Sequence, residues 1–328
     1  MSRQDIAFDV TAALPAAATQ GAAVTIAGWY FLPSAGAAAA APLRAIVMLA
    51  GGSYDKRYHD AQVPGRAGYS AAEHLAAAGH LVLLIDHLGV GGSTRLPDQK
   101  QATRHVCAQA AHAACEQFFG AVAGGTLHPA LPPRPDLVRI GCGHSMGGMQ
   151  TILQQAHHRT FDAVMILGYT AQGVHFSIDG RSVPAENFLP AEQPDYTRAD
   201  RAAMRDRFHW DDVPADVIAY DDSLSVEIPS GIGFDSIRMN VITAEAGRIE
   251  VPVYICLAER DNSPDYRAEP GYYRSSPDIT LHILARSGHC QNFAGTHHQM
   301  WDRMSQWASG IIAPEGEGGR TRRKFGVD

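Results

Sequence analysis

The stretch that decides the fold is Asp136-Leu-Val-Arg-Ile-Gly-Cys-Gly-His-Ser-Met-Gly-Gly-Met-Gln150. Its apolar first half predicts a short buried strand, and a helical pattern follows from Met146. Between the two stands a Gly-x-Ser-x-Gly motif centred on Ser145. Glycines on both sides allow the sharp backbone reversal of a nucleophile elbow, which holds a serine hydroxyl out at the edge of a sheet. The alternative is an inert serine in a small-residue turn, and the preceding strand argues against it.

Strands and helices alternate on both sides of this motif. Apolar runs predict buried strands at 45–50, 81–86, 137–142, 161–168, 249–258 and 279–284, and helical patterns lie at 68–79, 98–123, 146–158 and 293–309. Residues 5–9 and 22–32 alternate in polarity, as an antiparallel pair at a sheet edge does. The alternation predicts an α/β fold with a doubly wound, mostly parallel sheet.

Residues 171–250 break this pattern. They are rich in Pro, Asp and Arg, with one helical stretch at 198–209 and scattered aromatic residues. We interpret them as an insertion into a core made of residues 1–170 and 251–312. The tail, residues 313–328, is glycine-rich and charged, so we predict that it is disordered.

The composition limits the class of protein. Of the 328 residues, 45% are hydrophobic and 19% are charged, and no apolar run is long enough to cross a bilayer. The N-terminus lacks the basic segment and hydrophobic core of a secretory signal, so we expect a cytoplasmic protein that does not enter membranes. The net charge of −7 is spread along the chain and gives no electrostatic footprint for nucleic acid.

Cysteines, histidines and glycines give no sign of a metal or a cofactor. The five cysteines are an odd number with no Cys-x-x-Cys pair, which favours buried free thiols over disulfides. His105, His112 and Cys115 could share one face of a helix, but no carboxylate accompanies them, so we predict no metal site. The glycine clusters lack the third glycine of a dinucleotide motif and the Gly-Lys-Ser/Thr of a phosphate loop.

Three polar residues follow three of the apolar strands: Ser145, Asp261 and His289. The carboxyl ends of parallel strands meet at one edge of a sheet, where open α/β sheets bind their ligands. A serine hydroxyl becomes a nucleophile when an imidazole takes its proton and a carboxylate orients the imidazole. We therefore predict a catalytic triad of these three residues. Glu259 is the alternative acid, but it lies nearer the strand, where we expect it to pair with Arg260 or with solvent.

The strand at 45–50 ends in Gly51-Gly52-Ser53-Tyr54, where backbone N–H groups could approach a developing negative charge. We predict an oxyanion hole formed by the N–H groups of Gly52 and Met146, with Gly51 as the alternative to Gly52. His144 adjoins the nucleophile but should point away from it. The residues predicted to contact substrate are Gly51, Tyr54, His144, Phe208 and Trp210.

With these residues the chain resembles the α/β-hydrolase superfamily over about residues 20–310. The resemblance rests on the elbow motif, on Asp86-x-x-Gly89-x-Gly91-x-Ser93, on Glu-Arg-Asp261 and on Gly288-His289. One departure is Ala50-Gly51, which stands where many members have His-Gly. The resemblance implies that the insertion lies between the sixth and seventh family strands and forms a cap over the site.

The resemblance also implies a serine hydrolase that needs no cofactor. Its expected partner is a small-molecule substrate: an ester, thioester or lactone of medium size and partly apolar character. C–C bond hydrolysis, acyl transfer to another acceptor, and ligand binding with little turnover remain alternatives on the same triad. A homodimer also remains open.

Overall fold

The computed structural model describes residues 3–34, 42–178 and 181–312, so the predicted tail lies outside the described residues. Eight strands form one sheet: β1 (Gln4–Asp9), β2 (Thr25–Phe31), β3 (Arg44–Leu49), β4 (Leu81–Ile85), β5 (Val138–His144), β6 (Ala163–Leu167), β11 (Val253–Arg260) and β12 (Ile279–Gly288). Their order is β1-β2-β4-β3-β5-β6-β11-β12. β1 pairs antiparallel with β2, and β2 pairs antiparallel with β4. The other neighbours pair in parallel, which confirms the predicted sheet and its antiparallel edge.

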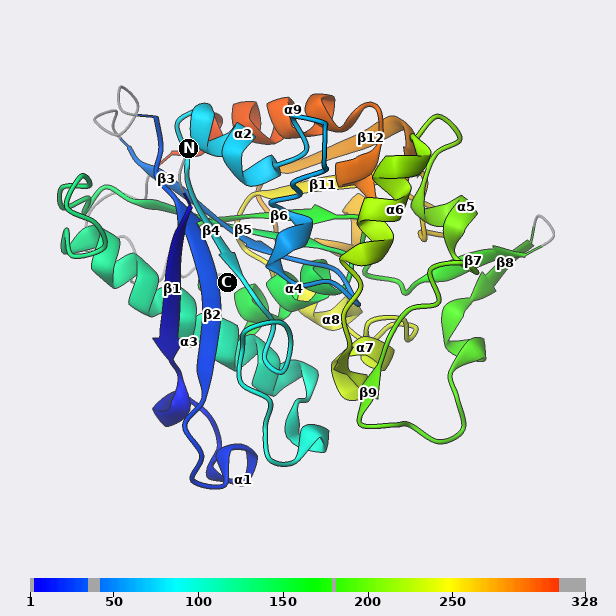
Figure 1. Cartoon of the computed structure of the whole chain (residues 1–328), viewed down its shortest axis with the longest axis horizontal. Helices are drawn as coiled ribbons and strands as arrows, with labels where there is room; N and C mark the ends of the chain where they lie inside the picture. The colour runs from blue at the N-terminus through cyan, green and yellow to red at the C-terminus, as the bar shows by residue number, and fades with distance from the viewer. Residues whose placement is uncertain (1–2, 35–41, 179–180, 313–328) are drawn as a thin grey trace, which may run out of the picture.

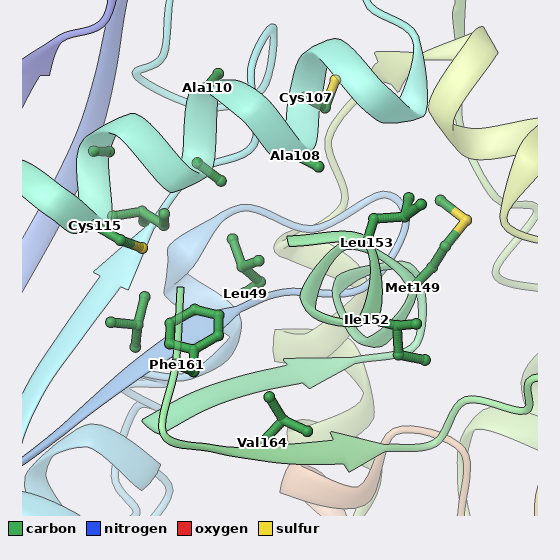
Figure 2. Close-up of a cluster of buried hydrophobic side chains, with 14 of the residues drawn as sticks. Leu49, Cys107, Ala108, Ala110, Cys115, Met149, Ile152, Leu153, Phe161 and Val164 are labelled. Atoms are coloured by element: carbon green, nitrogen blue, oxygen red, sulfur yellow. The ribbon is translucent and has the colours of Figure 1, made fainter. Parts of the chain in front are cut away.

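Helices cover both faces of the sheet (Figure 1). They are α2 (Ala71–Ala77) and α9 (His297–Gly310) on one face, and α3 (Arg104–Ala123) and α4 (Met146–His158) on the other. Ile46 and Met48 of β3 belong to the core under α2 and α9, whereas Val47 and Leu49 belong to the core under α3 and α4. Figure 2 shows part of this second core. Burial on both faces explains why the central strands are continuous apolar runs.

Some element ends differ from prediction, and one difference places a functional residue. β12 runs on to Gly288, beyond its predicted end at Leu284, because its register with β11 shifts and Arg286 adopts a left-handed φ of 52°. This bulge carries the strand on to the residue just before His289. α3 begins at Arg104 instead of residue 98, where the Thr103 hydroxyl accepts a hydrogen bond from the N–H of Val106. α9 likewise begins later, at His297.

Residues 171–250, which we interpret as an insertion, lie between β6 and β11 and carry short elements. They are β7 (His175–Ile178), β8 (Arg181–Pro184), β9 (Tyr196–Thr197), α5 (Arg205–Phe208), α6 (Ala215–Ser223), β10 (Ile228–Pro229), α7 (Ser230–Asp235) and α8 (Thr243–Ala246). Figure 1 shows β7, β8, β9, α5 and α6 gathered at one end of the molecule. The predicted helix at 198–209 is wrong except for its last turn, α5. Tertiary contacts replace its first half: the N–H of Ala199 donates to Ser53 of the core, and Arg201 pairs with Asp221 and Asp222.

All five cysteines are buried and free, as predicted. Among the described residues, no helix combines the length and apolar character needed to cross a membrane.

Candidate active site

The elbow has the geometry that its glycines predict. Ser145 follows β5, precedes α4, and has a φ of 53°, which an L-residue adopts only when its surroundings hold it there. A Cβ on Gly143 would overlap the backbone of Gly147, and one on Gly147 would overlap the carbonyl of Leu49. Both positions therefore require glycine. The start of α4 directs its unpaired N–H groups and the positive end of its dipole to the serine.

The structure brings Ser145, His289 and Asp261 together. The distance from Ser145 Oγ to His289 Nε2 is 3.0 Å, and that from His289 Nδ1 to Asp261 Oδ1 is 2.6 Å. A carboxylate only accepts hydrogen bonds, so Nδ1 carries the proton and Nε2 is free to accept the serine hydroxyl. The side chains of His289 and Asp261 are 6% and 1% exposed, so water hardly competes for this bond.

Backbone donors fix the orientation of the acid. The N–H of Ala258 donates to one carboxylate oxygen of Asp261 at 2.7 Å, and the N–H of Asn262 donates to the other at 2.8 Å. The alternative acid, Glu259, is turned elsewhere: it accepts a hydrogen bond from the N–H of Arg286 at 2.8 Å. Of the two surroundings expected for Glu259, solvent is the one observed: the residue is exposed, and the Arg260 guanidinium donates to Asp211 instead.

His144 is a buried neutral neighbour of this arrangement. Its Nε2 lies 2.8 Å from the carbonyl oxygen of His289, and its ring stacks on Tyr58 at a centroid distance of 4.7 Å. Burial lowers the pKa of His144 well below its ordinary value, and the nearby His289 adds to this effect. The ring of His144 therefore brings no positive charge to the site. A Cβ on Gly51 would lie 2.9 Å from His144 Nδ1, so this ring also requires glycine at that position.

The glycine loop, residues 51–54, lies opposite the elbow. A Cβ on Gly52 would be 3.9 Å from the Cβ of Met146, so the two predicted oxyanion donors are neighbours. In the part of the chain that the structure describes, the N–H groups of Gly52 and Met146 have no hydrogen-bond partner. Two free donors beside a serine hydroxyl can stabilise the negative charge of a tetrahedral intermediate.

A cavity of about 410 Å³ opens beside Ser145 and His289. The core contributes the glycine loop, His144 and Asn262 to its wall, and the insertion contributes the greater part. The apolar side chains from the insertion are Val174, Phe176, Ala185, Phe188, Ala199, Ala203, Met204, Phe208, Ile228, Phe234 and Ile237. Such a volume with a mainly apolar wall and a few polar groups is typical of a small-molecule site.

The predicted substrate contacts divide into two groups. Gly51, Tyr54, His144 and Phe208 line the cavity, and the ring of Phe208 stacks on His289 with centroids 5.9 Å apart. Trp210 lies outside the cavity wall as described, with the Arg260 guanidinium 4.5 Å from its ring centroid. Both aromatic residues stand in the insertion, where sequence alone gave no register to distinguish them.

Sequence reasoning missed two further features of the site. Asn262 lines the cavity, and its only signal was its position directly after Asp261. Asp221 is fully buried and accepts a hydrogen bond from the hydroxyl of Tyr54, a pairing for which the sequence carries no signal. The prediction of no metal concerned His105, His112 and Cys115. Each of the two histidine rings packs against a different histidine of α4, His157 and His158, and Cys115 is buried.

The sequence model of the serine aminopeptidase S33 family matches residues 65–292, more than two thirds of the chain. The chain belongs to this family of α/β-hydrolases. The resemblance seen in the sequence is thereby confirmed, and the chain is a hydrolase of the α/β-hydrolase family. No curated protein sequence matches it closely enough to count as a relative.

Solved structures share the fold of this hydrolase at low sequence identity. A soluble variant of monoglyceride lipase from Saccharomyces cerevisiae, in complex with a substrate analog, has a TM-score of 0.64 at 14% identity, covering 89% of this chain and 93% of that one. The α/β hydrolase GrgF from Penicillium sp. sh18 has a TM-score of 0.60 at 17% identity, covering 95% and 99%. A thermophilic esterase from Thermogutta terrifontis has a TM-score of 0.59 at 13% identity, covering 94% and 100%.

Proposed function

We propose that the protein is a serine hydrolase that cleaves an ester, thioester or lactone through an acyl-enzyme intermediate. The observation that carries this proposal is the chain of short contacts from Ser145 through His289 to Asp261 at the wall of an apolar cavity. The family and the fold support hydrolysis.

The reaction follows from the positions of the groups. Ser145 Oγ attacks the substrate carbonyl while His289 Nε2 takes the hydroxyl proton, and Asp261 stabilises the resulting imidazolium. The N–H groups of Gly52 and Met146 donate to the oxyanion. His289 then gives its proton to the leaving group, which departs and leaves the acyl group on Ser145. In the second half of the reaction, water attacks the acyl carbonyl while His289 takes a proton from the water. His289 then returns this proton to Ser145 Oγ as the acid product leaves.

The cavity supports a substrate of medium size with an apolar portion. Its volume suits a small molecule, and the aromatic and aliphatic side chains of the insertion would contact that apolar portion. In this proposal the insertion acts as a cap, because most of the cavity wall belongs to it. Phe188, at the wall, is 54% exposed, so substrate binding would bury further apolar surface there.

Covalent labelling tests the proposal directly. A fluorophosphonate should label Ser145, with the adduct found by mass spectrometry on the elbow peptide, and His289→Gln should slow the labelling because the base is lost. His282→Gln is the matched control: His282 lies on β12, the strand that ends just before His289, is also buried, and bonds to Tyr254 instead of Ser145. It should label at the wild-type rate.

Turnover separates the remaining alternatives. Against p-nitrophenyl esters of increasing chain length, the wild type should hydrolyse at least one member, and Ser145→Ala should lose activity by about 10³-fold or more. Labelling without turnover of esters, thioesters or lactones would favour the ligand-binding alternative. Turnover that requires an added alcohol or amine would favour acyl transfer. Failure of the wild type to label would reject the serine hydrolase.

A further inference from the structure

The insertion does more than cover the cavity, because one part of it is bonded to the loops that carry the proposed chemistry. This part, residues 199–226, is called the clamp segment here. It makes hydrogen bonds to the glycine loop and to the histidine loop, residues 288–290. Neither loop belongs to the insertion, and both stand directly beside Ser145.

The glycine loop is held at two successive residues. Ser53 Oγ accepts a hydrogen bond from the N–H of Ala199 at 2.7 Å, and the carbonyl oxygen of Ser53 accepts one from the N–H of Val226 at 2.9 Å. Ser53 has a φ of 63°, a left-handed conformation that a serine holds only when its surroundings fix it. The next residue, Tyr54, donates its hydroxyl to Asp221 Oδ1 at 2.8 Å. These bonds fix the residues that follow the proposed donor Gly52.

The anchor for Tyr54 is itself buried and paired. Asp221 is fully buried, forms an ion pair with Arg201, and lies 3.0 Å from His209 Nε2. All three residues belong to the clamp segment. A charged group inside a protein is costly unless it is paired, so this cluster resists rearrangement while the segment is docked. Burial, together with the Asp221 carboxylate, raises the pKa of Tyr54 well above its ordinary value, so its hydroxyl remains a donor.

The histidine loop is held by the backbone of the same segment. The N–H of His289 donates to the carbonyl of Arg207 at 2.7 Å, and the N–H of Cys290 donates to the carbonyl of Phe208 at 2.9 Å. The two loops also meet each other, because Cys290 Sγ lies 3.2 Å from the hydroxyl of Tyr54. A Cβ on Gly288 would come within 2.7 Å of the carbonyl oxygens of Arg207 and Phe208. The backbones are therefore in close contact.

A separate hydrophobic cluster fills the space between these parts. It joins Tyr54 and Tyr58 of the core to Phe208, Val217 and Leu224 of the clamp segment, along with Cys290. It is distinct from the two clusters that cover the faces of the sheet. The clamp segment thus buries its own apolar surface against the two loops that it bonds.

We propose that the clamp segment is a positioning element, so that the oxyanion donor Gly52 and the base His289 are aligned with Ser145 only while residues 199–226 are docked on the core. This inference rests on the proposed serine hydrolase function. Tyr54, Asp221 and Gly288 are positioning residues in it, because they act through the loops. Binding of a substrate that keeps the segment docked would also keep the catalytic groups aligned.

The test compares two buried tyrosines. Tyr54→Phe removes the hydroxyl that reaches Asp221, whereas Tyr58→Phe removes a buried hydroxyl that makes no hydrogen bond to the clamp segment within the described residues. The readout is the labelling of Ser145 by a small fluorophosphonate, resolved into its maximal rate and its apparent affinity, well below the melting temperature of each variant. Tyr54→Phe should lower the maximal rate about tenfold or more with little change in affinity, because a misplaced loop weakens the oxyanion contact. Tyr58→Phe should stay within about threefold of wild type.

A second pair of variants tests the histidine loop. Gly288→Ala places a methyl group against the clamp segment and should also slow labelling about tenfold, whereas Gly271→Ala, where a Cβ would meet no atom within 4 Å, should not. The double variant Tyr54→Phe/Asp221→Asn should label no more slowly than the slower of the two single variants, because the two side chains act as one unit.

The outcomes distinguish the two proposals. If the wild type labels and both Tyr54→Phe and Gly288→Ala label at its rate, the positioning role is refuted while the hydrolase stands. The positioning role is equally refuted if Tyr58→Phe lowers the labelling rate as much as Tyr54→Phe does. If the wild type itself does not label, the serine hydrolase is rejected and the positioning role with it.

Discussion

The core sheet and the insertion differ in what holds their backbone in place. In the core, strands share long hydrogen-bonded ladders, and α3 extends over 20 residues against the sheet. Among the described residues of the insertion, the longest helix is α6, with nine residues, and the strands pair two at a time. Helices this short are marginal by themselves, so the insertion depends on its contacts with the core. Under the two proposals the regions have different roles: the core carries the reacting groups, and the insertion shapes the cavity and aligns the loops around them.

Removing the carboxylate of Asp261 is the strongest test of the proposed catalytic role of the core. We expect Asp261→Asn to leave the protein folded and to lower kcat by about three to four orders of magnitude, because the histidine loses the anion that orients it. Steady-state kinetics on a p-nitrophenyl ester would measure this. Glu259→Gln is the control and should change kcat by no more than a few fold. If Glu259→Gln is the more damaging change, the acid is misassigned.

The junction between the two regions should respond to pH. Glu269, from the β11–β12 connection, accepts hydrogen bonds from the Ala171 N–H at 2.7 Å and the Thr170 hydroxyl at 2.8 Å, where the insertion begins. Burial raises the pKa of its carboxyl from 4.5 to about 7, against the opposing effect of these bonds. The folded protein therefore holds this proton more tightly than the unfolded chain. Its contribution to stability is complete below about pH 4.5 and is lost as the pH rises through about 7.

Glu269→Gln should remove this dependence, because its neutral amide resembles the protonated acid. The difference in unfolding free energy between wild type and variant should change by roughly 2–4 kcal/mol between pH 4.5 and pH 7.5, measured by urea denaturation. Parallel stability curves for the two proteins across this range would show that the carboxyl titrates normally.

A smaller effect is expected from the wall of the cavity. Phe234 of α7 lines the cavity and is only 8% exposed. We expect Phe234→Ala to shift the ratio of kcat/KM for long-chain over short-chain esters about tenfold, because one apolar contact in a pocket discriminates by that order. Trp210→Ala is the control, since its ring lies against Arg260 outside the cavity wall as described, and it should leave the ratio unchanged. A larger shift of this ratio for Trp210→Ala than for Phe234→Ala would show that Trp210 contacts the substrate.

The same division explains how much the sequence could predict. Strands such as β4 and β6 are fully apolar because both faces are buried, and the flanking glycines of Ser145 are required by backbone overlap, so local patterns sufficed for the sheet and the elbow. The helix expected at 198–209 failed because Ala199 and Arg201 are bound by residues far away in the chain. The extension of β12 to Gly288 depended on a bulge at Arg286, and a bulge leaves little trace in hydrophobic periodicity.

The position of β11 in the sheet has a consequence for how the chain folds during synthesis. β11 pairs with β6, although residues 168–252 separate them in the chain, and pairings across such spans form late because a long loop must close first. During synthesis the ribosome releases β5, the elbow and β6 well before β11 and β12. Ser145 and His289 are 144 residues apart, so the nascent chain contains the serine before the histidine has been translated. Under the proposed function, the newly made polypeptide would therefore have no activated serine until β11 and β12 have joined the sheet.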